Sequence, residues 1–441
     1  MDFIRKRITL LDEHTLEVVR KSFSSMVVKI SGMVAIFAVS ITLGRTIGPE
    51  GIGIIDLANR IVKIVLVLAM LGMNTVLLKE IAIAYEKKNW QHIANVIYTS
   101  VWVNIPLGFV LSLVFILLTP WITQSVFNEP ELKIPLIISL AVIIPQILSR
   151  IFASGINGFR KIWQSNLVND TLSKVLVALG LFTLLLFNIE ITVINVAILY
   201  AIGRIGVTLA VGGYWKHLFK FKGKRTLQTG PMLKVALPLL IVSSTTLVAK
   251  STDTVMLGWL STARDVGFYS VASKLGLLTN FFLAISISTL SPKIASLYAE
   301  KKMKELEKMI QQITKGLFFL GIGTIAVYFF VGKSILNLWG DEFIAAYLVL
   351  IIITIGQFFN VSTAGTSVFL VMTGHEKILG KIVFLSAIIN FTLNYLLIPK
   401  YGAAGAAIAT ASTVTVENII KVITVKQKTG ILTIPFLNKL N

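Results

Sequence analysis

Long apolar stretches separated by short polar segments recur along the whole chain of 441 residues. Each stretch is long enough to cross the roughly 30 Å hydrocarbon core of a bilayer as a helix. Uninterrupted apolar runs of this length indicate helices, which satisfy their own backbone polar groups in lipid. The pattern predicts an all-α polytopic membrane protein with about twelve transmembrane helices, near residues 23–43, 52–73, 93–119, 132–151, 165–187, 191–213, 235–259, 266–290, 309–332, 343–372, 379–399 and 402–425.

An internal repeat appears when the chain is shifted by about 214 residues. Gly53 and Arg60 then align with Gly267 and Lys274, at corresponding places in the predicted topology. Six spans per repeat is an even number, so both halves start on the same side of the membrane and are related by an axis along its normal. The repeat predicts two pseudosymmetric six-helix lobes around a central cavity. The expected parts are a cytoplasmic segment 1–22, an N-lobe 23–213, a basic linker 214–234, a C-lobe 235–425 and a cytoplasmic tail 426–441.

Composition supports this interpretation and narrows the partners. The chain is 55% hydrophobic and only 14% charged, whereas soluble domains carry about 25% charged residues. Lys and Arg number 41 against 21 Asp and Glu, a formal charge of +20. In a soluble chain such an excess would suggest nucleic acid, but polytopic membrane proteins keep basic loops in the cytosol. We therefore expect membrane lipids as partners, and no nucleic acid.

The distribution of these basic residues predicts the orientation. If the N-terminus is cytoplasmic, most of the Lys and Arg residues outside the spans fall on the inner side. The outer loops and outer span ends hold only Arg45, Lys133, Arg264, Lys333 and Lys400. This asymmetry predicts a multi-pass protein of the cell membrane with both termini in the cytoplasm.

Several kinds of chemistry are excluded. The chain has no cysteine and four scattered histidines, so thiolate metal sites, disulfides and paired histidine ligands are not expected. The outer loops reach only about a dozen residues, which leaves no room for a catalytic domain beside the membrane. We expect no enzyme, no metal and no cofactor.

Basic residues inside the spans are the candidates for binding. Each costs about 2.5–3.5 kcal/mol at a helix centre unless it is paired or hydrated. At ~1.5 Å per helical residue, four of them lie roughly 12–16 Å below the outer ends of their spans. These four come from both halves of the chain, and three more cations lie nearer the inner side. The proposed ligands of an anionic head group are Arg60, Lys63, Lys250 and Lys274, with Arg204, Lys174 and Lys29 as further members.

Acidic residues in the spans are fewer. Asp56 precedes Arg60 by four residues, Asp253 follows Lys250 by three, and Asp170 precedes Lys174 by four. Each spacing puts acid and base on one helix face. Two interpretations stay open: internal ion pairs that fix helix packing, or a cavity with surplus positive charge suited to phosphate or pyrophosphate. On location alone, the three aspartates are also candidates for carrying a coupling proton or sodium ion.

Three segments resemble a known family, the Wzx-type polysaccharide flippases of the multidrug/oligosaccharidyl-lipid/polysaccharide exporter superfamily. Residues 397–410 (LIPKYGAAGAAIAT), preceded by Asn390 and Asn394, are similar to its late-span signature. Residues 265–269 (DVGFY) resemble its spans 7 and 8, and residues 48–53 (GPEGIG) resemble its first outer loop. The likeness extends over nearly the whole chain.

The resemblance implies twelve helices in two lobes, and alternating access through a central cationic cavity. It also implies export of an oligosaccharide linked to a polyprenyl or dolichyl pyrophosphate. Related peptidoglycan-precursor flippases use cations in early spans of each lobe, and by position Arg60 and Lys274 match that use. The leading hypothesis is a flippase for a lipid-linked oligosaccharide, with a polysaccharide polymerase or glycosyltransferases as further partners. The alternatives are a cation-coupled multidrug antiporter and a peptidoglycan-precursor flippase.

Overall fold

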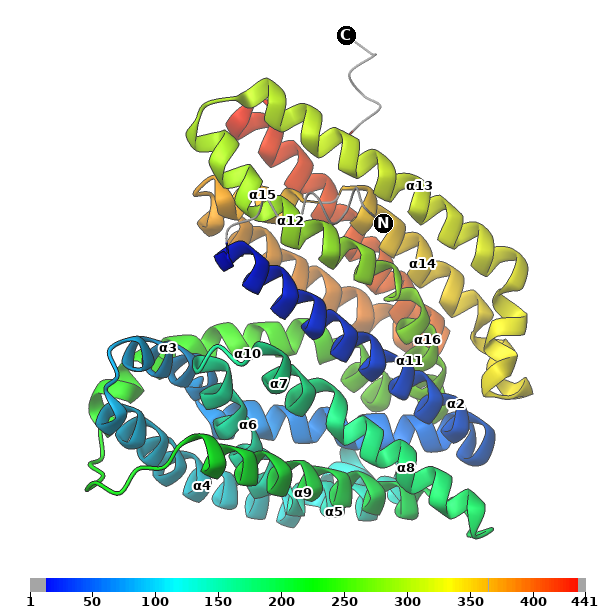
Figure 1. Cartoon of the computed structure of the whole chain (residues 1–441). Helices are drawn as coiled ribbons and strands as arrows, with labels where there is room; N and C mark the ends of the chain where they lie inside the picture. The colour runs from blue at the N-terminus through cyan, green and yellow to red at the C-terminus, as the bar shows by residue number, and fades with distance from the viewer. Residues whose placement is uncertain (1–12, 364, 435–441) are drawn as a thin grey trace. The chain divides into compact units, whose positions relative to one another are not determined.

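The structure, a computed structural model, describes residues 13–363 and 365–434, and every regular element in those residues is a helix (Figure 1). The predicted all-α class is thereby confirmed. Residues 1–12 of the predicted N-terminal segment and 435–441 of the predicted tail lie outside the described residues. The chain divides into two compact units. Unit 1 comprises the described residues up to Ile47 with Ala58–Lys250, and unit 2 comprises Gly48–Leu57 with the described residues from Ser251 onward.

Unit 1 is organised around one central helix. Its elements are α2 (Glu13–Met70) without residues 48–57, α3 (Met73–Glu86), α4 (Trp90–Trp121), η1 (Ile122–Val126), η2 (Pro130–Leu132), α5 (Lys133–Ala141), α6 (Ile143–Gly158), α7 (Ile162–Asn166), η3 (Leu167–Thr171), α8 (Leu172–Leu186), α9 (Val193–Leu218) and α10 (Thr229–Leu260) as far as Lys250. Helix α6 packs against α3, α4 and α9. Gly155 of α6 allows this approach, because a methyl group there would lie 2.7 Å from the Trp215 ring of α9.

Unit 2 contains the end of α10 and the remaining helices. These are α11 (Ala263–Gly276), α12 (Thr279–Ala299), α13 (Met303–Leu336), η4 (Asn337–Trp339), η5 (Asp341–Ala346), α14 (Tyr347–Ser362), α15 (Thr366–Met372) and α16 (Glu376–Thr429). Helix α14 lies beside α13 and α16, as Figure 1 shows, and also contacts α11. Trp339 and Phe343 are fully buried where η4 and η5 connect α13 to α14.

The two longest helices are each broken at a glycine. Helices α2 and α16 contain 58 and 54 residues, which at ~1.5 Å per residue would exceed the bilayer core more than twice over. Gly48 and Gly402 interrupt them with φ of 65° and 53°, a region that favours glycine. Pro49 follows the first break and Pro399 precedes the second. Each helix therefore divides into two membrane-length pieces, where the apolar runs 23–43 and 52–73, and 379–399 and 402–425, are expected to meet.

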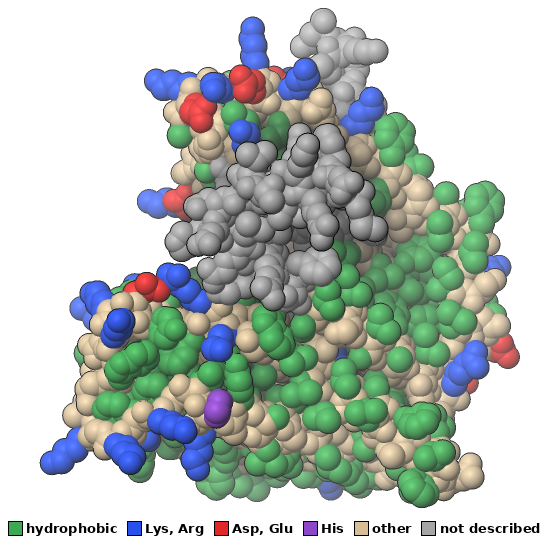
Figure 2. Space-filling model, viewed as in Figure 1, with side chains coloured by type: hydrophobic (Ala, Val, Ile, Leu, Met, Phe, Trp, Pro, Cys, Tyr) green, Lys and Arg blue, Asp and Glu red, His purple; other side chains and the backbone are tan. Residues whose placement is uncertain are grey.

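The helices are suited to a membrane in length and in surface. Six are long and apolar enough to span it, and two further pairs qualify when each pair, bent by 45°, is taken as one span. Hydrophobic side chains cover broad areas of the face shown in Figure 2. Large apolar side chains are exposed in both units, among them Phe109, Leu117, Leu209 and Phe330. Exposed apolar surface of this extent fits contact with lipid. The chain is thus a multi-pass membrane protein, while the count of twelve spans and the lobe boundaries stay predictions.

Candidate functional site

The four basic residues expected in one layer are divided between the two units. Arg60 and Lys63 lie on α2 in unit 1, where Arg60 is half-buried and Lys63 is exposed. Both make polar or electrostatic interactions. Lys274 lies on α11 in unit 2, and the side chain of Lys250 lies outside the described residues. Convergence of the four on a shared cavity stays a prediction.

Within unit 2, two glycines let α2 and α11 cross in backbone contact. A methyl group at Gly53 would lie 1.7 Å from the carbonyl oxygen of Ala263, and one at Gly267 would lie 1.9 Å from that of Pro49. Neither position tolerates a side chain without moving a backbone. Gly53 and Gly267 are also equivalent in the sequence repeat, as are Pro49 and Ala263. The repeat therefore relates the contact of Gly53 with Ala263 to the contact of Gly267 with Pro49.

One turn further along the crossing lies a charged group. The hydroxyl of Ser270 donates a hydrogen bond to Asp56 Oδ2, and Lys274 Nζ lies 3.5 Å from the same oxygen. The side chains of Lys274 and Asp56 keep 30% and 22% of their surface exposed. The sequence spacing predicts that Asp56 pairs with Arg60 on its own helix. The structure gives it partners on α11, which only the tertiary fold brings near, and its pairing with Arg60 stays a prediction.

Another predicted site carboxylate of unit 2, Asp253 on α10, has neutral partners among the described side chains. Its Oδ2 accepts hydrogen bonds from the hydroxyls of Tyr269 at 2.6 Å and Thr410 at 2.7 Å. Its Oδ1 accepts one from the amide of Asn394 at 2.8 Å. The sequence predicts pairing of Asp253 with Lys250, whose side chain lies outside the described residues. The three partners that the structure describes stabilise the negative charge of Asp253 by hydrogen bonds, and none of the three is a cation.

An unsatisfied oxygen lies on the same network. Asn394 is fully buried and its Oδ1 has no hydrogen-bond partner among the described residues, although its amide nitrogen also donates to Asn390 Oδ1 at 3.1 Å. A buried acceptor without a donor is costly. The carboxylate of Asp253, two hydroxyl oxygens and this amide oxygen are the hard donor types that small cations prefer. These are the ligand types that a sodium ion takes, and a carboxylate alone can take a proton.

Unit 1 has a separate basic group at Arg204. This residue lies on α9 and is half-buried, and its Nη2 donates a hydrogen bond to Asn59 Oδ1. Its Nη1 is buried and has no hydrogen-bond partner in the described part of the chain. Arg150 of α6 lies close enough for its charge to act on Arg204. The sequence singled out Arg204 but not Arg150, which falls at the end of a predicted span.

Lys29 and Lys174 are carried by neighbouring segments of unit 1. The Thr171 hydroxyl at the end of η3 donates to the Val28 carbonyl oxygen of α2 at 2.9 Å. Lys29 follows Val28 directly and is exposed, while Lys174 lies three residues beyond Thr171 and is half-buried. The two lysines therefore lie within three residues of the hydrogen bond that joins α2 to η3. Their predicted companion Asp170 has a side chain outside the described residues.

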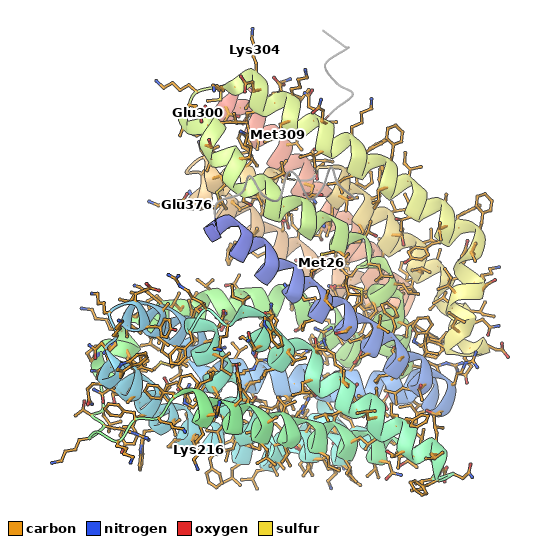
Figure 3. The ribbon with its side chains drawn as sticks, viewed as in Figure 1. Met26, Lys216, Glu300, Lys304, Met309 and Glu376 are labelled. Atoms are coloured by element: carbon orange, nitrogen blue, oxygen red, sulfur yellow. The ribbon has the colours of Figure 1, made fainter. Side chains whose placement is uncertain are left out.

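Charged residues also gather at the turn between α12 and α13, which, unlike the groups above, lies outside the spans. Figure 3 shows Glu300 and Lys304 there, at the same end of unit 2 as Glu376. Glu300 pairs with Lys302 at 2.8 Å and accepts a hydrogen bond from Ser296 at 2.9 Å. The hydrogen bond from Lys302, and after it the one from Ser296, lower the pKa of Glu300. The bond with Glu300 in turn raises the pKa of Lys302. Within residues 13–363 and 365–434, no three His, Asp or Glu residues gather as a metal site.

Comparison with known families identifies the chain. The model of the family described as polysaccharide biosynthesis protein matches residues 18–298, well over half of the chain. The chain belongs to the polysaccharide biosynthesis protein family. A second model, MatE, matches residues 238–396 of this family member. The exporter-superfamily resemblance expected from the sequence is thereby confirmed.

Curated relatives of this polysaccharide biosynthesis protein agree. It is 26% identical over 36% of its length to the capsular polysaccharide biosynthesis protein CapF of Staphylococcus aureus, matching 39% of that protein. It is 24% identical over 38% of its length to the probable low-salt glycan biosynthesis flippase Agl15 of Haloferax volcanii, matching 36% of that protein. A putative O-antigen export protein of Yersinia pseudotuberculosis is 23% identical over 81% of this chain and 84% of its own length. The chain spans 36–45% of the length of the first curated relatives that it matches.

Solved structures share the fold of this family member. The lipid II flippase MurJ in an inward closed conformation superposes with a TM-score of 0.73, at 17% identity, over 92% of this chain and 87% of that one. An inward-facing multidrug resistance MATE family transporter of the MOP superfamily gives 0.72, at 14% identity, over 92% and 97%. Likeness at these identities shows the fold alone, and it is the transporter fold that the sequence predicts.

Four residues of unit 2 complete the two carboxylate groups without having been predicted as ligands: Tyr269, Ser270, Asn394 and Thr410. All are neutral, so a search for charge misses them. A signal was present nonetheless. Asn390 and Asn394 are two amides one helical turn apart in an otherwise apolar span, and polar residues are costly there unless they have partners.

Proposed function

We propose that the protein is a flippase that moves an oligosaccharide linked to a polyprenyl pyrophosphate from the inner to the outer leaflet. The export would serve assembly of a surface polysaccharide or glycan. The observation that carries the proposal is the match to a putative O-antigen export protein over 81% of this chain, in a chain whose family is polysaccharide biosynthesis. The transporter fold supports export and not a catalytic reaction. A polymerase or glycosyltransferases of the same assembly would be its partners.

The head-group ligands are proposed to be the cations of the spans. Lys274 supports this assignment, because its side chain is 30% exposed and reachable although it belongs to a membrane helix. A cation in such a position is costly unless it serves a polar guest or a wet cavity. Arg60, Lys63 and Lys250 would act with it on the pyrophosphate. Arg204, Lys174 and Lys29 would receive the head group nearer the inner side, in alternating access with both termini cytoplasmic.

Transport is proposed to be coupled to a sodium ion or a proton at Asp253. Supporting this role are the three neutral donors on its carboxylate and the unpartnered amide oxygen of Asn394 within the described residues. Asp56 supports coupling less well, because Lys274 already neutralises it. Asp170 stays a candidate by position.

A multidrug antiporter is the second candidate function. The MatE match over residues 238–396 favours it, as does the acidic character of Asp253. A cationic drug, however, would need surplus negative charge, and the spans of this chain carry more basic than acidic residues. A flippase for a peptidoglycan precursor would share the pyrophosphate chemistry, so only the sugar would distinguish it.

The test is leaflet transfer in proteoliposomes. The probe is a fluorescent short-chain polyprenyl pyrophosphate bearing N-acetylglucosamine, followed by quenching of the label from outside. We expect transfer above that of protein-free vesicles, and its loss in an Arg60→Ala, Lys274→Ala double variant. Lys333→Ala is the control, since Lys333 is exposed in the last turn of α13. Ion-driven efflux of ethidium with no lipid transfer would instead establish the antiporter.

A further inference from the structure

Asp56, Ser270 and Lys274, called the Asp56 group below, all lie at positions that the sequence repeat aligns. Asp56 and Ser270 are 214 residues apart and hydrogen-bonded, which is the shift that aligns the two halves of the sequence. Lys274 and Arg60 are likewise equivalent. The repeat therefore supplies two equivalent cations but a single carboxylate, because Ser270 stands where a second acid would be. The excess of positive charge is built into this asymmetry.

The contact between Asp56 and Lys274 is weak by its geometry. Its 3.5 Å length exceeds the roughly 2.7–2.9 Å that is usual for a charged hydrogen bond. The contacts with Ser270 and with Lys274 fall on the same oxygen, Oδ2, which accepts from both side chains. Both side chains are also partly exposed, so the attraction is screened. A pair of this kind exchanges readily for a better ligand of the ammonium.

We propose that Asp56 is an internal counter-ion that occupies Lys274 between substrates and competes with the pyrophosphate for it. The incoming head group displaces the carboxylate, and Asp56 returns to the ammonium as the head group leaves. Asp56 thus sets how tightly the head group is held and how fast it is released. Ser270 is the positioning residue. Its hydroxyl holds the displaced carboxylate of Asp56 and weakens the attraction between that carboxylate and Lys274. This inference rests on the flippase function proposed above.

The inference predicts opposite effects for two small substitutions. Asp56→Asn removes the competitor, so the half-saturating concentration of the fluorescent lipid should fall about two- to five-fold, as expected for a partly exposed pair. The maximal rate should fall as well, because release slows. Ser270→Ala frees the carboxylate to bind Lys274 more tightly, and the half-saturating concentration should rise about two-fold.

The matched control is Glu342→Gln. It also removes a carboxylate from an ion pair of unit 2, that of Glu342 with Arg264 at 2.9 Å, on exposed side chains. It should leave both kinetic parameters unchanged. A purely structural Asp56–Lys274 pair would lower the melting temperature of Asp56→Asn without lowering the half-saturating concentration, and that result overturns the inference.

Direct binding separates this inference from the flippase proposal. Inorganic pyrophosphate is titrated into the detergent-purified full chain at fixed salt. Asp56→Asn should bind it about two- to five-fold more tightly than the wild type, and Lys274→Ala more weakly. If the wild type moves no lipid but this order holds, the flippase function fails and the competition stands. If lipid moves but Asp56→Asn binds no tighter, the competition fails alone. Should Asp56→Asn not fold, Ser270→Ala decides instead, because pyrophosphate binding no weaker than in the wild type overturns the competition.

Discussion

Asp56 and Asp253 lie in the same unit, on membrane helices, and differ in what surrounds them. Asp56 shares one oxygen between the Ser270 hydroxyl and the Lys274 ammonium. Asp253 receives hydrogen bonds from Tyr269, Thr410 and Asn394, all neutral. The charge of Asp56 is therefore compensated, whereas the partners of Asp253 among the described side chains stabilise its charge without cancelling it. The difference supports the two roles proposed above, in which Asp56 yields the Lys274 ammonium to an anionic guest and Asp253 attracts a cation.

Helix α11 links the two groups through consecutive residues. Tyr269 bonds Asp253 and Ser270 bonds Asp56, so any rotation of α11 displaces partners of both carboxylates together. We therefore expect filling of the proposed ion site at Asp253 and emptying of the proposed anion site at Lys274 to be mechanically connected. Coupling of this kind requires an element with two arrangements, and α11 is the element that carries residues of both proposed sites.

The largest effect is expected at Asp253. Asp253→Asn keeps the shape of the side chain and removes the charge that would hold the ion. Loss of one charged partner at a buried site costs about 3–5 kcal/mol, so ion-driven transport should fall about 100-fold or more. The measurement is lipid transfer with and without a sodium or pH gradient. A variant that still responds fully to both gradients would remove Asp253 from coupling and end the contrast with Asp56.

The next effect is expected at Lys274. Lys274→Ala removes an ammonium that would bind the pyrophosphate, at about 1.5–3 kcal/mol for a charged hydrogen bond, or roughly a 10- to 100-fold loss of transfer. Response to the ion gradient should persist in the residual activity, because Asp253 is untouched. Lys333→Ala should behave as the wild type. Equal losses in both lysine variants would show that general charge, and not the Asp56 group, binds the head group.

The sequence predicts the helices better than the sites. Apolar runs locate the spans because the bilayer imposes their length and composition, and the glycines at 48 and 402 fall where neighbouring runs meet. Pairing is different, because i to i+4 spacing detects only partners on one helix. Asp56 contacts a lysine that is 218 residues away, and Asp253 contacts an amide 141 residues away.

The repeat came closest to predicting the Asp56 group. Alignment of Gly53 with Gly267 and of Arg60 with Lys274 identifies equivalent positions, and a two-fold axis can bring equivalent positions into contact. What the alignment does not contain is how closely the backbones approach. That depends on the absence of two side chains, at Gly53 and Gly267, against the carbonyl groups of Ala263 and Pro49.

An intermediate effect is expected when a side chain is added at the crossing of α2 and α11. Gly267→Ala places a methyl group 1.9 Å from the Pro49 carbonyl oxygen, so the helices must separate at a cost of about 1–3 kcal/mol in the free energy of unfolding. Because α11 carries partners of both carboxylates, lipid binding and ion response should weaken together. Gly323→Ala on α13 is the control, since a methyl group there meets nothing within 4 Å in the described chain. Thermal unfolding in detergent measures both, and a Gly267→Ala protein with unchanged melting temperature would contradict the crossing.

The smallest effect is expected at a third carboxylate, which lies outside the spans. Hydrogen bonds from Lys302 and Ser296 lower the pKa of Glu300, so any stability it adds is present above the ordinary carboxyl pKa and is lost as pH falls through the lowered one. Because Glu300 is exposed to water, screening makes that contribution negligible. Lys302→Ala should raise the Glu300 pKa towards its ordinary value, seen by NMR of labelled glutamate, while lipid transfer changes less than about two-fold. We therefore expect a carboxylate to affect transport only when it is buried in the membrane beside suitable partners. A large transport defect in Lys302→Ala would contradict this, because it would show that charge at the water-facing turn also affects transport.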